Sequence, residues 1–185
     1  MVFNWIQFVS LSAKIYCKTI FGTVHKNACI GVVSNKLNCV MAMKQIDYNS
    51  TEYQAMVSLR MKILREPLGL SFNKEDLEKE KNDILLSAYD DDKMVGCCVL
   101  TRINEETCQL RQMAVISSMQ KNGLGSGLLD FAEKVAYDNG FRRMVMHARK
   151  TAIGFYQKQG YDIQGEEFEE VTIPHFEMQK RLIKL

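Results

Sequence analysis

The stretch Ser117–Leu129, "SSMQKNGLGSGLL", places three glycines within five residues, directly before a run with helical spacing. Glycine lets successive backbone N–H groups converge, and the N-terminus of a helix adds partial positive charge. The stretch therefore predicts a turn that binds an anion. The glycines alone do not identify the anion, because an ordinary loop would use them for turning as well.

Two common phosphate-binding motifs fit this turn poorly. A nucleotide P-loop needs Gly-x-x-x-x-Gly-Lys-Ser/Thr, and no lysine stands at the required place. A dinucleotide fold needs Gly-x-Gly-x-x-Gly, whereas the spacing here is Gly-x-Gly-x-Gly. A binder of nucleotide phosphates stays open only as a remote alternative.

The flanks of the turn are more specific. "QKNGLG" (120–125) follows an apparent strand, "LRQMAV", and opens an amphipathic helix. The block "TAIGFYQKQGY" (151–161) comes later in the chain. Together the two blocks resemble the Gln/Arg-x-x-Gly-x-Gly/Ala and Ala-x-x-Phe-Tyr-x-x-x-Gly-Phe/Tyr motifs of the GCN5-related N-acetyltransferases (GNAT). The ending "GEEFEEVTIPHFEMQK" resembles the ElaA/YjcF-like branch of that family.

The pattern of elements agrees with this resemblance. From Lys44 onward the chain reads as strand, two helices, three strands, helix, strand, helix and two strands, an α/β order. The first strand is "KQIDY", and Thr51–Gln54 fits a capping box at the start of the first helix. The second helix, "NKEDLEKEKND", is expected to be solvated on most of its surface. The resemblance implies the GNAT fold, a mixed central β-sheet with a splayed strand pair flanked by helices.

The resemblance also implies acetyl-coenzyme A as cosubstrate, with no metal. The pantetheine arm would pair with the backbone of the strand before the turn, and one N–H there would hold the thioester carbonyl. The pyrophosphate would lie on the turn itself. The cofactor-binding residues implied in this way are Met113, Ala114, Val115, Gln120, Lys121, Asn122, Gly123, Leu124, Gly125, Ser126, Gly127 and Tyr156.

Tyr156 is the first catalytic candidate, because in the family this tyrosine protonates the departing thiolate or hydrogen-bonds its sulfur. The base is open. Many relatives use a Glu on the central strand, where this chain offers only Arg111 and Gln112. His175 and Glu170 are the favoured candidates, and a structural role for His175 is equally compatible with its position. The remaining candidates are Glu167 and His147, of which His147 is expected to pack in the core.

One position departs from the family pattern. Many relatives carry Asn seven residues before the tyrosine, where its amide contacts the cofactor, and this chain has Arg149 there. An arginine there could reach a phosphate, reach a pantetheine carbonyl or face solvent, so no role is carried over to it.

The 185 residues suit one domain. Residues 1–46 contain no Asp or Glu, which separates them in composition from the rest. We expect residues 1–42 to be an N-terminal extension outside the fold, with a targeting segment as the alternative, and residues 43–185 to form the GNAT domain. No cysteine pair has metal or redox spacing, so reduced thiols and a cytoplasmic location are expected.

The composition also bears on partners. A net charge of +2 argues against nucleic acid, and no apolar run is long enough to span a membrane. The expected function is transfer of an acetyl group from acetyl-coenzyme A to a primary amine of a small molecule or protein, by direct attack in a ternary complex. A homodimer is compatible with the family. The alternative is a non-catalytic acyl-coenzyme A sensor, suggested by the missing central-strand Glu.

Overall fold

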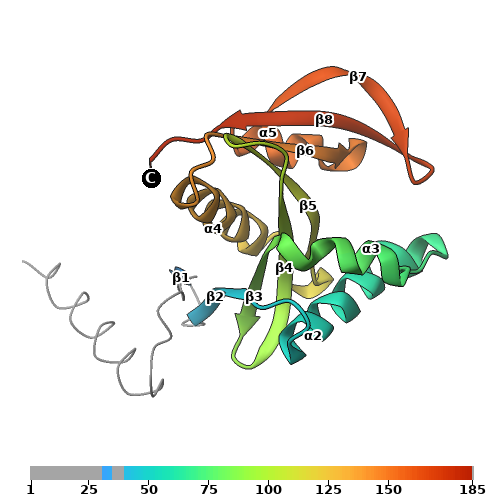
Figure 1. Cartoon of the computed structure of the whole chain (residues 1–185), viewed down its shortest axis with the longest axis vertical. Coiled ribbons are helices and arrows are strands. Elements are labelled where there is room, and N and C mark those ends of the chain that lie inside the picture. Colours follow the sequence, from blue (N-terminus) through green and yellow to red (C-terminus); the bar gives the residue numbers. More distant parts are fainter. Residues whose placement is uncertain (1–30, 35–39, 185) are drawn as a thin grey trace, which may run out of the picture.

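The structure, a computed structural model, describes residues 31–34 and 40–184, which form an α/β domain (Figure 1). Its strands are β1 (Gly31–Ser34), β2 (Val40–Ile46), β3 (Ile84–Asp90), β4 (Lys93–Arg102), β5 (Thr107–Val115), β6 (Arg143–Arg149), β7 (Asp162–Glu170) and β8 (Ile173–Arg181). Its α-helices are α2 (Thr51–Arg60), α3 (Lys74–Glu78), α4 (Leu124–Asp138) and α5 (Ile153–Lys158). Shorter helical turns are η1 (Met61–Arg65), η2 (Glu66–Leu68), η3 (Lys79–Asn82), η4 (Ser117–Met119) and η5 (Lys150–Ala152).

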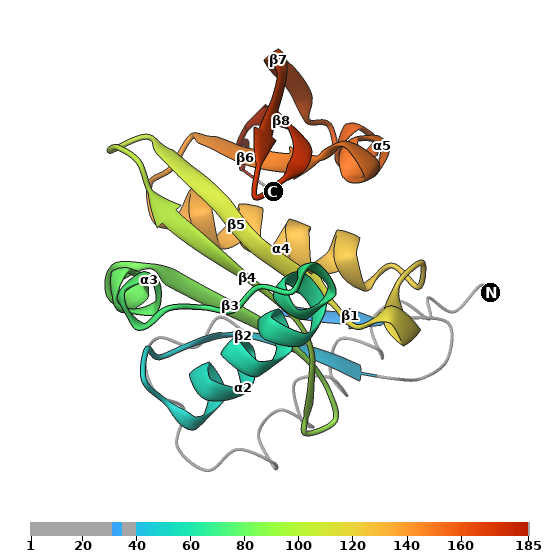
Figure 2. The ribbon, with the colours of Figure 1, turned by 90° about the vertical axis from the view of Figure 1, so that its right-hand side faces the viewer.

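The described strands form one sheet in the order β1-β2-β3-β4-β5-β6-β8-β7. β5 and β6 run parallel, whereas the other neighbouring strands are antiparallel. The parallel pairing is short, because it joins only Thr107–Gln109 to Arg143–Val145. Beyond these residues the two strands separate, and β6 continues in register with β8 (Figure 2). The predicted mixed sheet with a splayed strand pair is confirmed.

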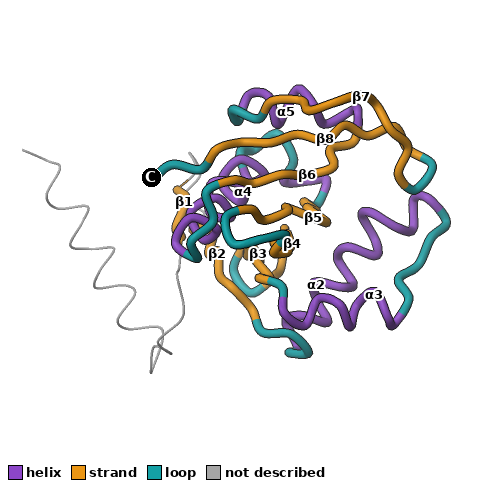
Figure 3. The backbone as a smooth tube through the Cα atoms, turned by 45° about the horizontal axis from the view of Figure 1, so that its top comes forward, coloured by secondary structure: helices purple, strands orange, loops and turns teal. Residues whose placement is uncertain are grey.

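Helices cover both faces of the sheet, with α4 on one side and α2 and α3 on the other (Figure 3). α4 buries Leu128 and Ala132 in a core shared with β2 to β6 and β8. α2 buries Met56 in a second core, against β2 to β5. Phe155 and Tyr156 of α5 pack against the first core, so α5 lies on the same face as α4. The gap where β5 and β6 separate therefore lies between α4 and α5 on one face of the sheet and α2 and α3 on the other.

The start of α2 differs from the prediction. Ser50 is the N-cap residue, and its Oγ accepts the backbone N–H of Tyr53 at 3.0 Å. Thr51 lies inside the first turn, so the predicted capping box at Thr51 is wrong. Ser50 and Thr51 are both suitable caps by residue type, and the sequence pattern does not separate two adjacent hydroxyl residues.

Ser50→Ala is expected to lower the free energy of unfolding by about 1 kcal/mol, because the N–H of Tyr53 loses its acceptor. Thr51→Ala is the matched control, with an expected change within about 0.5 kcal/mol. Urea denaturation followed by circular dichroism measures both. An equal or larger loss in Thr51→Ala would show that Ser50 is not the cap.

β2 is the strand expected at Lys44–Tyr48, and it begins earlier, at Val40. It runs across the predicted boundary between residues 42 and 43, and Met41 and Met43 are both buried in the first core. Residues 1–30 and 35–39 lie outside the described residues, so the role of the extension stays a prediction. In the part of the chain that the structure describes, no helix combines the length and the apolar character needed to cross a bilayer.

Candidate active site

The separation of β5 from β6 opens a cleft of about 960 Å³. Its lining comes from η1, β5, the turn before α4, β6, α5 and the β7–β8 turn. All three predicted catalytic residues lie there, although they come from α5, β7 and β8. Of the predicted site residues, the cleft is lined by Tyr156, His175, Glu170, Met113, Ala114, Val115, Gln120, Lys121, Gly123, Gly125 and Ser126, but not by Asn122, Leu124 or Gly127.

The glycine-rich turn forms the start of α4. Gly123 is the N-cap with φ 82, a left-handed conformation that suits glycine. The N–H of Gly127 makes the first helical bond, to the carbonyl of Gly123 at 2.9 Å. The N–H groups of the three residues between them precede that bond and have no helical acceptor of their own. These N–H groups and the positive end of α4 can hold a phosphate in the cleft.

Three residues of the predicted set do not line the cleft. Leu124 is 2% exposed within the first core, and Gly127 is buried as well. The Nδ2 of Asn122 donates to the carbonyl of Ser118 at 3.4 Å, which closes the turn rather than the cleft. Leu124 can still offer its backbone N–H, because it is the first residue of the helix.

Gly125 lies close to the opposite wall of the cleft. A Cβ at this position would be 3.5 Å from Cζ of Phe155 and 3.8 Å from Cε of Met113. These are ordinary van der Waals distances, so alanine fits. A longer side chain has to extend into the space beside the helix N-terminus.

β5 carries a bulge beside the cleft. Gln112 has φ 51, and the pairing with β4 slips between Cys97 and Val99. Gln112 and Met113 therefore share one partner on β4, and the side of β5 that faces away from β4 has no ladder partner beyond Gln109. The backbone of Met113 to Val115 is thus available to an extended ligand between the strands.

Tyr156 places its hydroxyl at this edge. The hydroxyl lies 3.6 Å from the sulfur of Met113, and the ring makes edge contacts with Phe155 and Tyr161. Burial, chiefly, raises the pKa of the Tyr156 phenol well above its usual value of 10.0. The phenol therefore keeps its proton at neutral pH and can act as a hydrogen-bond donor or an acid beside β5.

His147 faces the cleft, so the prediction that it packs in the core is wrong. Met146 and Ala148 on either side of it point into the first core, and strand alternation turns His147 to the other face. Its side chain is 38% exposed, and its Nδ1 N–H donates to Oε2 of Glu170 at 2.6 Å. Glu170 is therefore engaged by His147. Glu167 forms an ion pair with Lys150 and does not line the cleft.

His175 is 8% exposed, and its Nδ1 lies 2.8 Å from the carbonyl oxygen of Ile173. A carbonyl only accepts, so Nδ1 carries the proton of the neutral ring and Nε2 keeps its lone pair. The ring stacks on Phe168, which also contacts His147 edge-on. β8 thus places His175 at the cleft with an Nε2 that can take a proton, and Nε2 of His147 on β6 has no recorded hydrogen-bond partner among the described residues either.

Comparison with known proteins agrees with this geometry. The sequence model of the Acetyltransferase (GNAT) family matches residues 53–161, more than half of the chain. The chain belongs to the GNAT family. Accordingly, it is an acyltransferase, and the predicted family membership is confirmed.

Individual relatives support the same assignment. The chain is 33% identical over 107 residues to the uncharacterized N-acetyltransferase YjcF of Bacillus subtilis, covering 57% of this chain and 74% of YjcF. Two solved structures share the fold. ElaA of Escherichia coli is 15% identical with a TM-score of 0.67, covering 76% of this chain and 99% of ElaA. A GNAT family acetyltransferase from Elizabethkingia anophelis with acetyl-CoA bound is 20% identical with a TM-score of 0.59, covering 77% of this chain and 98% of that protein.

The GNAT fold here includes a buried ionic network that the sequence analysis missed. Arg60 and Glu80 are 0% and 2% exposed and form a bidentate pair at 2.8 and 2.9 Å. The Tyr53 hydroxyl donates to Glu80 at 2.8 Å, and Nε2 of Gln112 donates to it at 3.1 Å. The network therefore ties α2 and η3 to the bulge of β5. Arg60 follows Tyr53 and Met56 at helical spacing, so all three residues lie on one face of α2. This spacing was the sequence signal that Arg60 points inward with the other two.

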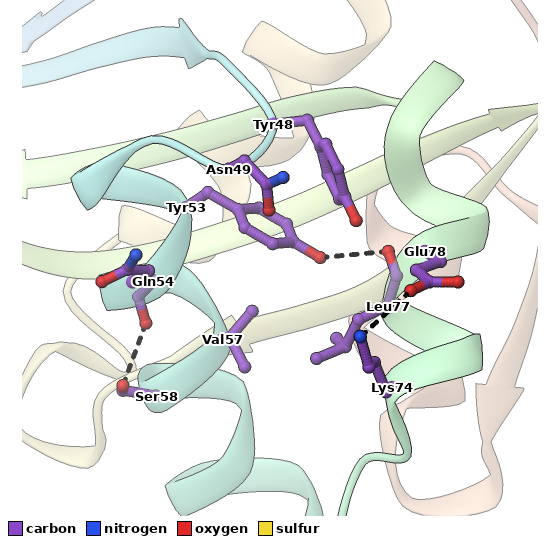
Figure 4. A pocket seen from close by; sticks show the side chains of 9 residues that line it. All are labelled: Tyr48, Asn49, Tyr53, Gln54, Val57, Ser58, Lys74, Leu77 and Glu78. Atoms are coloured by element: carbon purple, nitrogen blue, oxygen red, sulfur yellow. Dashed lines mark hydrogen bonds and ion pairs between the residues drawn. The ribbon is translucent and has the colours of Figure 1, made fainter.

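A second hollow, of about 460 Å³, lies between α2 and α3, and Tyr53 of the network is part of its lining (Figure 4). Tyr53 points from α2 across it, with its hydroxyl 3.4 Å from the carbonyl of Leu77. Lys74 and Glu78 at its rim pair with each other. The charged groups on this surface are matched, so the cleft at β5 and β6 remains the candidate active site.

Proposed function

We propose that this GNAT protein transfers the acetyl group of acetyl-coenzyme A to a primary amine, by direct attack in a ternary complex. The observation that carries the proposal is the convergence of three features on one cleft. These are the free N-terminus of α4, the unpaired edge of β5 and the hydroxyl of Tyr156. The relative from Elizabethkingia anophelis, which holds acetyl-CoA, supports the choice of acyl donor.

The turn before α4 would bind the pyrophosphate. The N–H groups of Leu124, Gly125 and Ser126 supply donors, and Lys121 adds a positive charge at the same end of the cleft. Backbone groups of β5 would pair with the pantetheine arm, because that edge has no neighbouring strand. No metal is required, since the helix end and Lys121 provide the positive field.

The reaction forms a bond between the amine nitrogen and the acetyl carbon and breaks the bond between that carbon and sulfur. An N–H of the β5 edge would stabilise the oxyanion of the thioester carbonyl. Tyr156 would give its proton to the departing sulfur. His175 would take the amine proton through Nε2, because its Nδ1 is occupied by a carbonyl. Glu170 would hold His147 in place beside the acceptor.

The cellular setting is part of the proposal. Cys97, Cys98 and Cys108 are free and buried, as suits a reducing compartment, so we place the protein in the cytoplasm. A homodimer stays a prediction, and so does the absence of nucleic-acid and membrane partners.

Gly125→Asp is expected to weaken acetyl-coenzyme A binding at least about tenfold, or 1.4 kcal/mol, because its carboxylate would lie against the pyrophosphate. The fold should survive, since Asp is favourable in the first turn of a helix. Gly125→Ala is the matched control and should bind within a few-fold of the parent chain, because its Cβ makes only ordinary contacts. Isothermal titration of the full chain measures all three.

The outcomes separate the candidate functions. A folded parent chain that does not bind acetyl-coenzyme A contradicts the proposal. Binding that is unaffected by Gly125→Asp would move the phosphate site away from this turn. Tight binding with no turnover on a broad amine panel would favour the acyl-coenzyme A sensor, a role suggested by the missing Glu on the central strand.

A further inference from the structure

The charges that line the cleft are unequal. Glu170 is the single carboxylate among the described lining residues, and it is engaged by His147 at 2.6 Å. Four permanent cations face it. They are Arg65, Arg111, Lys121 and Arg149. A cleft with this balance attracts anions, and an amine acceptor with further positive charges would be repelled.

The cations divide between the two halves of the cleft. Lys121 lies in the turn before α4, where the phosphates of the acyl donor are expected. Arg149 lies at the end of β6, one alternation beyond His147, on the face turned away from the α4 core. Its Nη2 donates to the carbonyl of Leu64 in η1 at 3.4 Å, so it reaches toward α2 rather than α4. This direction favours the acceptor half.

Arg149 has no carboxylate partner within ion-pair distance among the described residues. Two acids of β7 are paired with other groups, Glu170 with His147 and Glu167 with Lys150. Among the described residues, only one guanidinium N–H of Arg149 has a protein acceptor, and that hydrogen bond is long. A half-buried guanidinium gains most from a bidentate anion, which would use its parallel N–H groups.

The other two arginines of the cleft, Arg65 and Arg111, interact with other groups of the protein. Arg65 stacks over the ring of Phe72 at 4.8 Å and has Asp76 within electrostatic range. Arg111 similarly acts on Asp83 at a distance. Neither acid lines the cleft, so both arginines still add positive potential at its mouth. Arg149 is therefore the arginine of the cleft with the fewest interactions of its own among the described residues.

We propose, on the basis of the acetyltransferase function above, that the acceptor is a small amine that also carries an anionic oxygen group, held by Arg149. The cleft of about 960 Å³ must also contain the pantetheine arm, which leaves room for a small molecule. His175 pairs in register with Arg149 across β6 and β8. The anion at Arg149 would thus bring the amine close to the nitrogen that takes its proton. A free amino acid has this chemistry, and so does a phosphorylated amine.

The test compares acceptors with and without the anionic group. A panel of L-amino acids is assayed against the corresponding amino-acid amides, with phosphoethanolamine and spermidine as further acceptors, by release of free coenzyme A thiol from the full chain. We expect kcat/KM for the best amino acid to exceed that for its amide by roughly tenfold to 100-fold. Phosphoethanolamine as the better substrate would identify phosphate as the anion. Spermidine as the best acceptor would overturn the inference.

Arg149→Met assigns the effect to this residue. It should raise KM for the anionic acceptor by roughly tenfold to 100-fold while the amide is unaffected, and Arg149→Lys should recover only part of the loss. Arg143→Met, on the same strand but outside the cleft, is the matched control and should behave as the parent. Acetyl-coenzyme A affinity, measured separately by titration, should not change in any of these variants.

Different results would contradict the acetyltransferase function and the proposed class of acceptor. If Arg149→Met weakens acetyl-coenzyme A binding instead of acceptor binding, Arg149 belongs to the cofactor and the inference is wrong. If neutral amines turn over as well as anionic ones, the acetyltransferase function stands and the acceptor class is wrong. If the chain neither binds acetyl-coenzyme A nor turns over any amine, the proposed function fails and this inference with it.

Discussion

Tyr156→Phe is expected to lower kcat by about 10²- to 10⁴-fold, with little change in acetyl-coenzyme A affinity. The hydroxyl is the single atom removed, and it lies at the unpaired edge of β5, 3.6 Å from the sulfur of Met113. Its ring contacts with Phe155 and Tyr161 remain available to phenylalanine. The loss should therefore fall on the chemical step rather than on binding.

The protonation state of Tyr156 adds a second readout. Burial raises the pKa of its phenol above the usual 10.0, so the acid form persists as the pH rises through 9. In the parent chain, loss of the Tyr156 proton should not limit kcat below about pH 10. An activity loss on the alkaline side well below that pH would assign the acid role to another group.

Tyr137→Phe is the control for a tyrosine hydroxyl outside the cleft. Tyr137 lies near the C-terminal end of α4, where Arg142 packs over its ring. Steady-state kinetics of thiol release and titration of acetyl-coenzyme A are measured for both variants. A fall in kcat of less than about threefold in Tyr156→Phe would leave the tyrosine with a packing role, because a positioned general acid contributes far more.

The fold and the cleft were largely predictable because their signals are local. The glycine-rich turn and the helix after it lie in one continuous stretch, and the backbone geometry at Gly123 is what that stretch implies. The block that contains Phe155 and Tyr156 is equally continuous. Local motifs of this kind fix a strand, a turn and a helix at once, and the splayed pair β5 and β6 was implied by the family resemblance that these motifs carry.

The missed features depend on contacts between distant residues. Arg60 and Glu80 are 20 residues apart, and Glu80 lies in "KEDLEKEKND", a run that reads as solvated by composition alone. His147 was misplaced because the strand around it, "RRMVMHA", has apolar residues on both faces, which hides the alternation. The direction of the His147 side chain is decided by the register of β6 with β8 and by the core that packs on only one face of β6. Neither can be read from a few neighbouring residues of the sequence.

Glu80→Ala is expected to lower the free energy of unfolding by about 3–5 kcal/mol, because it leaves the guanidinium of Arg60 buried without its partner. The loss has further consequences inside the network. Tyr53 and Gln112 both lose an acceptor, and Gln112 is the residue that forms the bulge of β5. The edge of β5 that faces the cleft should therefore become less ordered, and acetyl-coenzyme A binding should weaken along with stability.

Two variants give this prediction its controls. Glu78→Ala removes an exposed carboxylate two residues away, whose pairing with Lys74 is solvated, and should change stability by less than about 1 kcal/mol. Arg60→Met combined with Glu80→Leu removes both charges and should recover most of the loss, because no buried ion is then left unpaired. Urea unfolding followed by circular dichroism measures each variant. A cost below about 1 kcal/mol for Glu80→Ala would mean that water reaches Arg60 and that the network does not hold the bulge.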